Sequence, residues 1–93
     1  YACGFIFFPG GYGTLDELFE ALTMIQTGKI DRMPVVLFGS SYWKGLHDWI
    51  VRELRENGMI SPGDEALVTI TDDPQETVDI MVDSVLKKRN SES

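Results

Sequence analysis

The sequence predicts an α/β fold in which a parallel sheet is covered by helices on both faces. Three short apolar runs alternate with three amphipathic segments, in the order strand, helix, strand, helix, strand, helix. The strand runs are apolar almost throughout, which is typical of parallel strands that are buried on both faces. We therefore expect a three-layer α/β/α arrangement with right-handed crossovers.

The first two helices each carry an apolar stripe that we expect to face the core. The predicted strands are Gly4–Phe8, Met33–Phe38 and Leu67–Thr71, and the predicted helices are about Thr14–Thr27, Tyr42–Asn57 and Pro74–Arg89. The stripe of the first helix follows the i, i+3, i+4, i+7 rule and comprises Leu15, Leu18, Phe19, Leu22 and Ile25. The expected core residues of the second helix are Trp43, Leu46, Trp49, Ile50 and Leu54.

Small and polar residues are expected at the helix ends. Glycine adopts the left-handed conformation that ends many helices, and the glycines in this position are Gly28 and Gly58. Side-chain oxygens cap helix N-termini, and the candidates are Ser40 or Ser41 for the second helix and Asp72 or Asp73 for the third. A proline, Pro74, suits the first position of that third helix. A turn is predicted at Ser61–Asp64.

The chain length suggests one domain that is part of something larger. Residues 1–89 of the 93 are expected to form the C-terminal portion of a single domain, and residues 90–93 a frayed tail. Tyr1 leads almost directly into a strand, without the polar start of a natural N-terminus. Three strands alone bury a small core and leave sheet edges open, so we expect upstream strands, a partner subunit or both.

Composition excludes several classes of protein. A net charge of −7 argues against a nucleic-acid partner, which would require clustered Lys and Arg. No apolar run approaches the roughly 20 residues of a membrane helix. The single cysteine, Cys3, excludes an internal disulfide and fits a reducing, cytoplasmic compartment.

A glycine-rich turn joins the first strand to the first helix and is the main candidate for a site. Gly10, Gly11 and Gly13 can adopt positive φ and can admit a ligand close to the backbone. Thr14 is expected to cap the helix and to offer its hydroxyl to a phosphate, and the helix dipole favours an anion. The turn matches neither common phosphate loop: it lacks the Gly-Lys-Ser/Thr ending, and Asp16 occupies the third glycine position of the dinucleotide fingerprint. A sharp turn without a ligand is the alternative.

Two acids follow the turn. Asp16 and Glu17 could simply complement the helix dipole from the first turn. Alternatively, Glu17, which lies well over 100° from the centre of the apolar stripe, could face a bound sugar. A carboxylate there could position ribose hydroxyls, stabilise an oxocarbenium-like centre or activate water.

The stretch "PGGYGTLDE", Pro9–Glu17, resembles the P-G-G-x-G-T-x-x-E signature of the LOG family of cytokinin riboside 5′-monophosphate phosphoribohydrolases, long labelled "possible lysine decarboxylase". The match is complete over nine positions. The stretches "FFPGGYGTLDELFEALTMIQTGKI", "MPVVLFGSSYW" and "TDDP" are similar to the bacterial branch, so the resemblance covers nearly the whole chain.

This resemblance implies a Rossmann-like nucleotide-binding domain that hydrolyses the N-glycosidic bond of a nucleoside 5′-monophosphate, AMP or N6-modified AMP. The products would be free base and ribose 5-phosphate, without a metal or redox cofactor. By position, Glu17 would be catalytic, and the phosphate or nucleotide would be bound by Gly10, Gly11, Tyr12, Gly13 and Thr14. The family's catalytic arginine lies in an upstream motif that has no counterpart in this chain.

The remaining candidates favour structural roles or partners. Lys29 and Lys44 are not placed for the Schiff base of a pyridoxal-phosphate decarboxylase, and His47 is expected to be structural. Met24 shares the helix face of Glu17, which predicts cover by a partner subunit, as in the family's homo-oligomers, or by the missing N-terminal half. The alternatives to the enzyme are a Rossmann-like module that binds or senses nucleotides without cleaving them and a scaffold with a vestigial site.

Overall fold

The computed structural model describes residues 3–60, 63 and 66–92, and it confirms the predicted order of elements. These are β1 (Phe5–Phe7), α1 (Tyr12–Gln26), β2 (Val35–Phe38), α2 (Ser40–Ile50), the π-helical segment η1 (Val51–Arg55), β3 (Val68–Thr71) and α4 (Pro74–Glu92). The predicted turn at Ser61–Asp64 lies outside the described residues, apart from Gly63.

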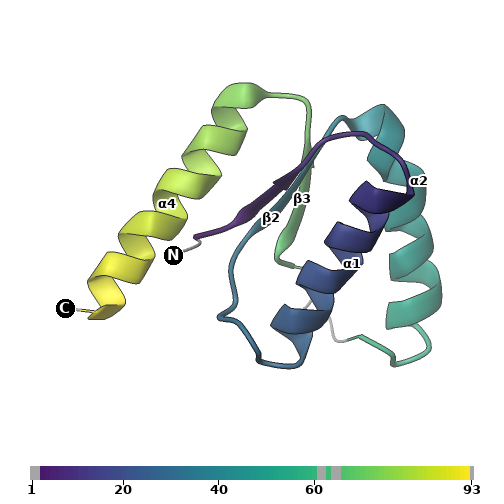
Figure 1. The fold of residues 1–93 in the computed structure, drawn as a ribbon, viewed down its shortest axis with the longest axis horizontal. Helices are drawn as coiled ribbons and strands as arrows, with labels where there is room; N and C mark the ends of the chain where they lie inside the picture. Colours follow the sequence, from purple (N-terminus) through teal and green to yellow (C-terminus); the bar gives the residue numbers. More distant parts are fainter. Residues whose placement is uncertain (1–2, 61–62, 64–65, 93) are drawn as a thin grey trace.

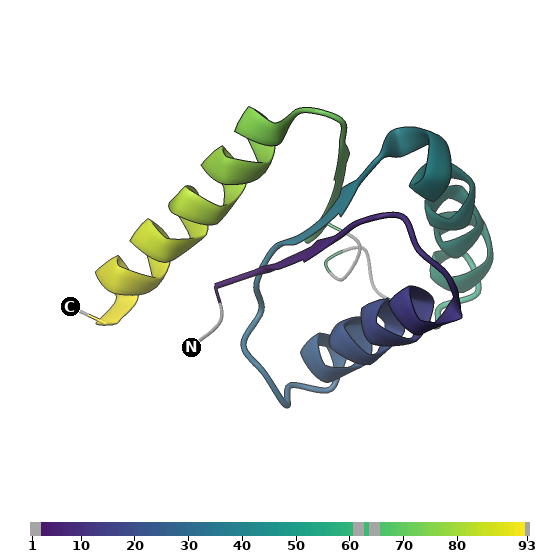
Figure 2. The same cartoon turned by 45° about the horizontal axis from the view of Figure 1, so that its top comes forward.

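The three strands form one parallel sheet in sequence order, with β2 in the centre. In its register, Ile6 lies opposite Val36, which in turn lies opposite Thr69. Right-handed crossovers between neighbouring strands in this order place both connecting helices on one face. Figure 1 shows α1 and α2 together on that face and α4 across the other, and the turned view in Figure 2 agrees. The predicted α/β/α layering is therefore confirmed.

The core lies between the sheet and the helices α1 and α2. Its buried members are Phe7, Leu18, Ala21, Ile25, Met33, Val35, Leu37 and Trp43. Trp43 is fully buried, and its indole Nε1 donates a hydrogen bond to the Phe38 carbonyl at 3.1 Å. This satisfies the ring's one polar atom, so burial of the large apolar surface stabilises the fold without an unpaired donor.

Two expected core residues lie at the surface instead. Phe19 is 38% exposed and Trp49 is 46% exposed. On α1 the buried arc is centred near Leu18 and Ile25, and Phe19 lies about 100° from Leu18, so Ala21 fills the inward position. The prediction for Trp43 is confirmed, whereas the prediction for Trp49 is wrong.

Glycines end α1 and the α2–η1 segment as predicted. Gly28 has φ of 77° and Gly58 has φ of 75°. After each glycine the next amide bonds back to the last turn, from Lys29 to the Met24 carbonyl at 2.9 Å and from Met59 to the Leu54 carbonyl at 2.8 Å. These bonds satisfy carbonyls that the helix itself leaves unpaired.

The predicted end of the last helix is wrong. α4 continues through Glu92 rather than stopping near Arg89, so residues 90–92 are helical instead of a frayed tail. Neither glycine nor proline follows Arg89, and nothing else in the local sequence breaks the helix.

Helix α4 packs on the sheet through one side only. The Ser84 hydroxyl donates to the Cys3 carbonyl, and a Cβ placed on Gly4 would lie 2.6 Å from the Met81 sulfur. The opposite side carries an exposed apolar stripe made of Val78, Val82, Val85 and Leu86. Within the described part of the chain, no helix combines the length and apolarity that a membrane crossing requires.

Two glycine substitutions should change stability in opposite directions. Gly28→Ala forces a Cβ into a left-handed conformation and should lower the free energy of unfolding by about 1–2 kcal/mol. Gly45→Ala, inside α2 with open space around its Cα, should raise the free energy of unfolding by about 0.5–1 kcal/mol. Urea denaturation of the full-length protein measures both changes, and equal midpoints for the two variants would contradict this account.

Candidate functional site

Three helix N-termini meet at one edge of the sheet. Because the strands are parallel, their carboxyl ends share this edge, which lies at the top of Figure 1, and α1, α2 and α4 all begin there. Each N-terminus presents unpaired N–H groups and the positive end of a helix dipole. The edge is therefore suited to negatively charged groups. The three helices differ in what accepts the hydrogen bonds of their first N–H groups.

The N-terminus of α2 is occupied by a carboxylate from the neighbouring strand end. Asp72 Oδ1 accepts a hydrogen bond from the Ser40 amide at 2.7 Å, and Asp72 Oδ2 accepts one from the Ser40 hydroxyl at 2.6 Å. Hydrogen bonds from the Ser40 side chain and backbone hold the pKa of Asp72 below its ordinary value. The expectation that Ser40 or Ser41 caps this helix is wrong: the N-cap is Gly39, and Ser40 is itself held by Asp72.

The N-terminus of α4 is occupied by the next acid in the chain. Asp73 Oδ1 accepts a hydrogen bond from the Gln75 amide at 2.9 Å, and the Asp73 carbonyl accepts one from the Thr77 amide at 3.2 Å. Of the two predicted candidates, Asp73 thus caps α4. Two consecutive acids serve two different helices, since Asp72 reaches back to α2.

The N-terminus of α1 has no side-chain cap. The helix begins at Tyr12 with Gly11 as its N-cap, and the Gly11 carbonyl accepts the Leu15 amide at 3.2 Å. Thr14 therefore lies in the first turn, and the prediction that it caps the helix is wrong. Glycine is tolerated at the N-cap, where the backbone is extended, even though it has no side chain to accept a hydrogen bond from the first amides. Alone of the three helix ends at this edge, α1 leaves its first amides open to an external anion.

The glycines of the turn serve close approach rather than positive φ. Among the described residues, positive φ occurs at three other glycines, so the glycines of the turn do not use this conformation. A Cβ on Gly10 would lie 2.2 Å from the Thr14 hydroxyl oxygen, whereas Cβ atoms on Gly11 and Gly13 would meet nothing within 4 Å. A side chain at position 10 would therefore displace the Thr14 side chain, whereas Gly11 and Gly13 border open space in which a ligand could approach the backbone.

The turn is held from the adjacent strand and helix. The Tyr42 hydroxyl, in the first turn of α2, donates a hydrogen bond to the Gly10 carbonyl. A Cβ on Gly39 would lie 3.1 Å from Pro9 Cγ, so the two strand ends pass close together. The Phe8 and Phe38 rings pack at 5.6 Å between centroids. Sequence patterns did not indicate Tyr42, because its contact with Gly10 spans 32 positions.

Asp16 and Glu17 are both exposed and lie in the second turn of α1. The first turn contains no acid, so neither residue sits where the helix dipole acts most strongly. On a helix, Glu17 and Gln26 point in opposite directions. The Gln26 side chain donates to the Met59 carbonyl beyond η1, so Glu17 faces away from α2, toward the side where β1 forms the sheet edge.

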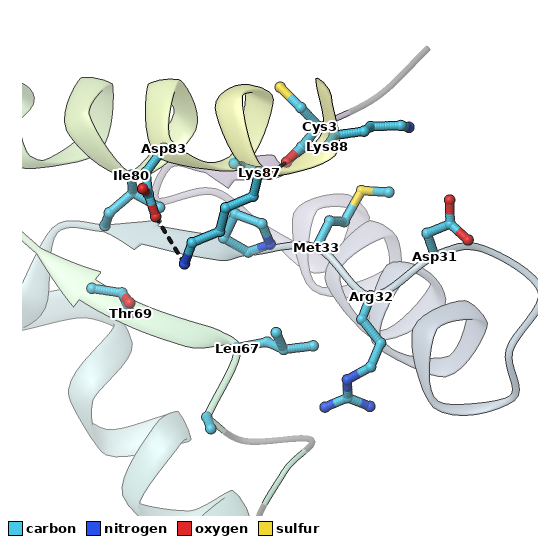
Figure 3. Close-up of a pocket in the computed structure, with 13 residues that line it drawn as sticks. Cys3, Asp31, Arg32, Met33, Leu67, Thr69, Ile80, Asp83, Lys87 and Lys88 are labelled. Atoms are coloured by element: carbon cyan, nitrogen blue, oxygen red, sulfur yellow. Dashed lines mark hydrogen bonds and ion pairs between the residues drawn. The ribbon is translucent and has the colours of Figure 1, made fainter. Parts of the chain in front are cut away.

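A cleft of about 750 Å³ lies at the opposite end of the sheet, beneath the C-terminal half of α4 (Figure 3). Its cations already have partners: Lys87 pairs with Asp83 at 3.0 Å, and Arg32 donates to the Gly63 carbonyl. We therefore place the candidate site at the glycine turn, where backbone donors are open, and not in this cleft.

The other predicted residues lie outside this cluster. The Tyr12 side chain is 90% exposed. His47 is half-buried and lines a small apolar cavity between α1 and α2, in keeping with a structural role. Lys29 follows the C-terminus of α1, the end opposite the turn.

A parallel sheet, a glycine turn at its carboxyl edge and an uncapped helix N-terminus define a Rossmann-like α/β protein with a candidate anion site. A family model described as "Possible lysine decarboxylase" matches residues 1–81. The chain therefore belongs to this family, the LOG family.

Relatives with assigned names come from fungi, plants and bacteria. The chain is 39% identical over 67 residues to a bifunctional cytokinin biosynthesis protein of Fusarium pseudograminearum, covering 72% of this chain and 14% of that protein. It is 36% identical over 81 residues to a cytokinin riboside 5′-monophosphate phosphoribohydrolase of Arabidopsis thaliana (87% and 38%). A protein of the same name from Mycobacterium tuberculosis is 41% identical over 58 residues (62% and 30%). The chain thus matches well under half of the length of each relative.

Replacing Asp72 should alter the acid sensitivity of the fold. The folded-state pKa of Asp72 is lowered, so its contribution to stability is complete above its ordinary pKa and is lost as the pH falls through the lower folded value. We expect Asp72→Asn to lower the urea midpoint of the full-length protein at pH 7, and the difference from the parent to shrink toward pH 3.

The matched control is Asp48→Asn, which removes the same charge from the last turn of α2, the end opposite Ser40. It reports the general effect of one carboxylate fewer. If the parent and Asp72→Asn lose stability in parallel between pH 7 and pH 3, the Asp72–Ser40 contact does not have the assigned role.

Proposed function

We propose that the protein containing this chain hydrolyses the N-glycosidic bond of a nucleoside 5′-monophosphate, AMP or N6-modified AMP. The products are the free base and ribose 5-phosphate. The observation that carries the proposal is the open N-terminus of α1, which stands beside two helix ends already occupied by Asp72 and Asp73. The names of the plant and bacterial relatives support the same reaction.

In this proposal the 5′-phosphate binds at the start of α1. The amides of the first turn and the dipole of a 15-residue helix favour a dianion. Gly11 and Gly13 leave room for the phosphate oxygens, since no atom lies within 4 Å of where their side chains would be. The Thr14 hydroxyl, which lies against Gly10, is available as a further donor.

Glu17 supplies the carboxylate for the reaction. A rise of about 1.5 Å per residue puts its Cα about 9 Å along the axis from Gly11, and helical side chains lean back toward the N-terminus. A ribose that extends from the phosphate can therefore reach the carboxylate. There Glu17 stabilises positive charge at C1′ and accepts a proton from the attacking water. The water oxygen bonds to C1′, the C1′–N bond breaks, and the base leaves with the electron pair and takes up a proton.

A catalytic role explains an arrangement that binding alone would not favour. The Glu17 carboxylate repels a nearby phosphate, so a site that only bound nucleotides would be better without it. Its exposed position on the β1 side of α1 also leaves it accessible to groups outside the described residues. We propose that the catalytic arginine implied by the family resemblance approaches from this side. We also predict that the protein is cytoplasmic. We predict that it forms homo-oligomers through the side of α1 that carries Glu17 and Met24.

Neutralising Glu17 should abolish most of the activity without abolishing binding. In the full-length protein, Glu17→Gln should lower kcat/KM for adenine release from AMP by about 10²–10⁴-fold, the usual contribution of a general acid or base. Adenine release is followed by chromatography, and AMP affinity by calorimetry.

The matched control is Asp16→Asn, which removes one negative charge at nearly the same distance from the helix N-terminus but on another side of α1. It should retain activity close to that of the parent. A Glu17→Gln variant as active as the parent would exclude the role assigned to Glu17. Binding of AMP by the parent without release of base would instead identify a non-catalytic nucleotide-binding module.

A further inference from the structure

We propose that Tyr42 is a positioning residue of the glycine turn, which it holds in the conformation that receives phosphate. The proposal rests on the function proposed above, because it assumes that this turn binds the 5′-phosphate. It adds a residue outside the family signature, since Tyr42 lies 25 positions after Glu17 and belongs to a different helix.

The Tyr42 hydroxyl fixes one peptide plane of the turn. It donates a hydrogen bond to the carbonyl oxygen of Gly10. That carbonyl shares a planar trans peptide with the N–H of Gly11, so the two groups point in opposite directions. Fixing the Gly10 carbonyl toward Tyr42 therefore directs the Gly11 N–H away from Tyr42.

The same hydrogen bond strengthens the Gly11 N–H as a donor. Hydrogen bonds in series polarise the peptide group between them, so a carbonyl that accepts from a hydroxyl makes its own N–H a better donor. The turn also needs an external anchor, because glycines lose more conformational freedom on ordering than other residues. Among the described residues, the Tyr42 hydroxyl and the Thr14 side chain lie against Gly10 in this way.

Tyr42 is itself firmly placed. Its ring packs edge-on against Trp43 at 4.7 Å between centroids, and Trp43 is fully buried. Two residues earlier, Ser40 is held through its amide and its hydroxyl by Asp72. The chain of contacts thus runs from the end of β3, through the start of α2, to the turn after β1. This supports the uncapped end of α1 from the neighbouring helix without occupying its donors.

The test is Tyr42→Phe in the full-length protein, which removes the hydroxyl and keeps the ring. The loss of one hydrogen bond that acts through the phosphate site should raise KM for AMP by about 3- to 10-fold and leave kcat within about 2-fold. The affinity for ribose 5-phosphate, measured by calorimetry, should fall by the same factor.

The matched control is Ser84→Ala, which also removes a hydroxyl that donates to a backbone carbonyl, that of Cys3, at the far side of the sheet. It should leave KM and the ribose 5-phosphate affinity unchanged. An unchanged KM and affinity in Tyr42→Phe would overturn the proposal, as would equal effects in both variants.

If the parent releases no adenine yet binds ribose 5-phosphate, the hydrolase proposal fails, and the affinities alone decide the role of Tyr42. If the parent binds neither AMP nor ribose 5-phosphate, both proposals fail.

Discussion

The parallel pairing of β1, β2 and β3 in sequence order is the constraint on which the other features depend. It brings the three strand ends to one edge, and it places α1 and α2 side by side on one face (Figure 2). Residues that are 32 positions apart in sequence become neighbours there, as Gly10 and Tyr42 do, and likewise Ser40 and Asp72. The central strand anchors this arrangement, with Val35 and Val36 fully buried between the two helical layers.

The shared edge creates an excess of positive helix ends, and the protein neutralises them unequally. Asp72 and Asp73 satisfy α2 and α4 from within the chain, at the cost of two carboxylates held in fixed positions. Helix α1 has no acid in its first turn, and its N-cap is a glycine, Gly11. The α1 end therefore differs from the other two in that its first amides are open to a ligand.

Sequence patterns were sufficient to predict the strands and helices, but not the contacts between them. Continuous apolar runs and glycine terminators such as Gly28 are local signals, so the order of elements and the ends of α1 and of the α2–η1 segment were predicted correctly. The N-terminus of α4 was also predicted, with Asp73 as its cap. Those of α1 and α2 were not, because Asp72 at the end of β3 satisfies the α2 donors, and Gly11 rather than Thr14 is the N-cap of α1. The nine-residue signature identified the family, yet it contains no signal for Tyr42, whose role depends on how α2 packs beside the turn.

The stripe of Val78, Val82, Val85 and Leu86 on α4 makes the colloidal behaviour of this chain dependent on its charge. At neutral pH a net charge of −7 opposes the approach of two copies, and this repulsion limits contact between their apolar stripes. Near the sequence pI of 4.4 the repulsion vanishes, while the apolar surface stays the same. The chain on its own is therefore most prone to self-association in mild acid, through the exposed stripe of α4.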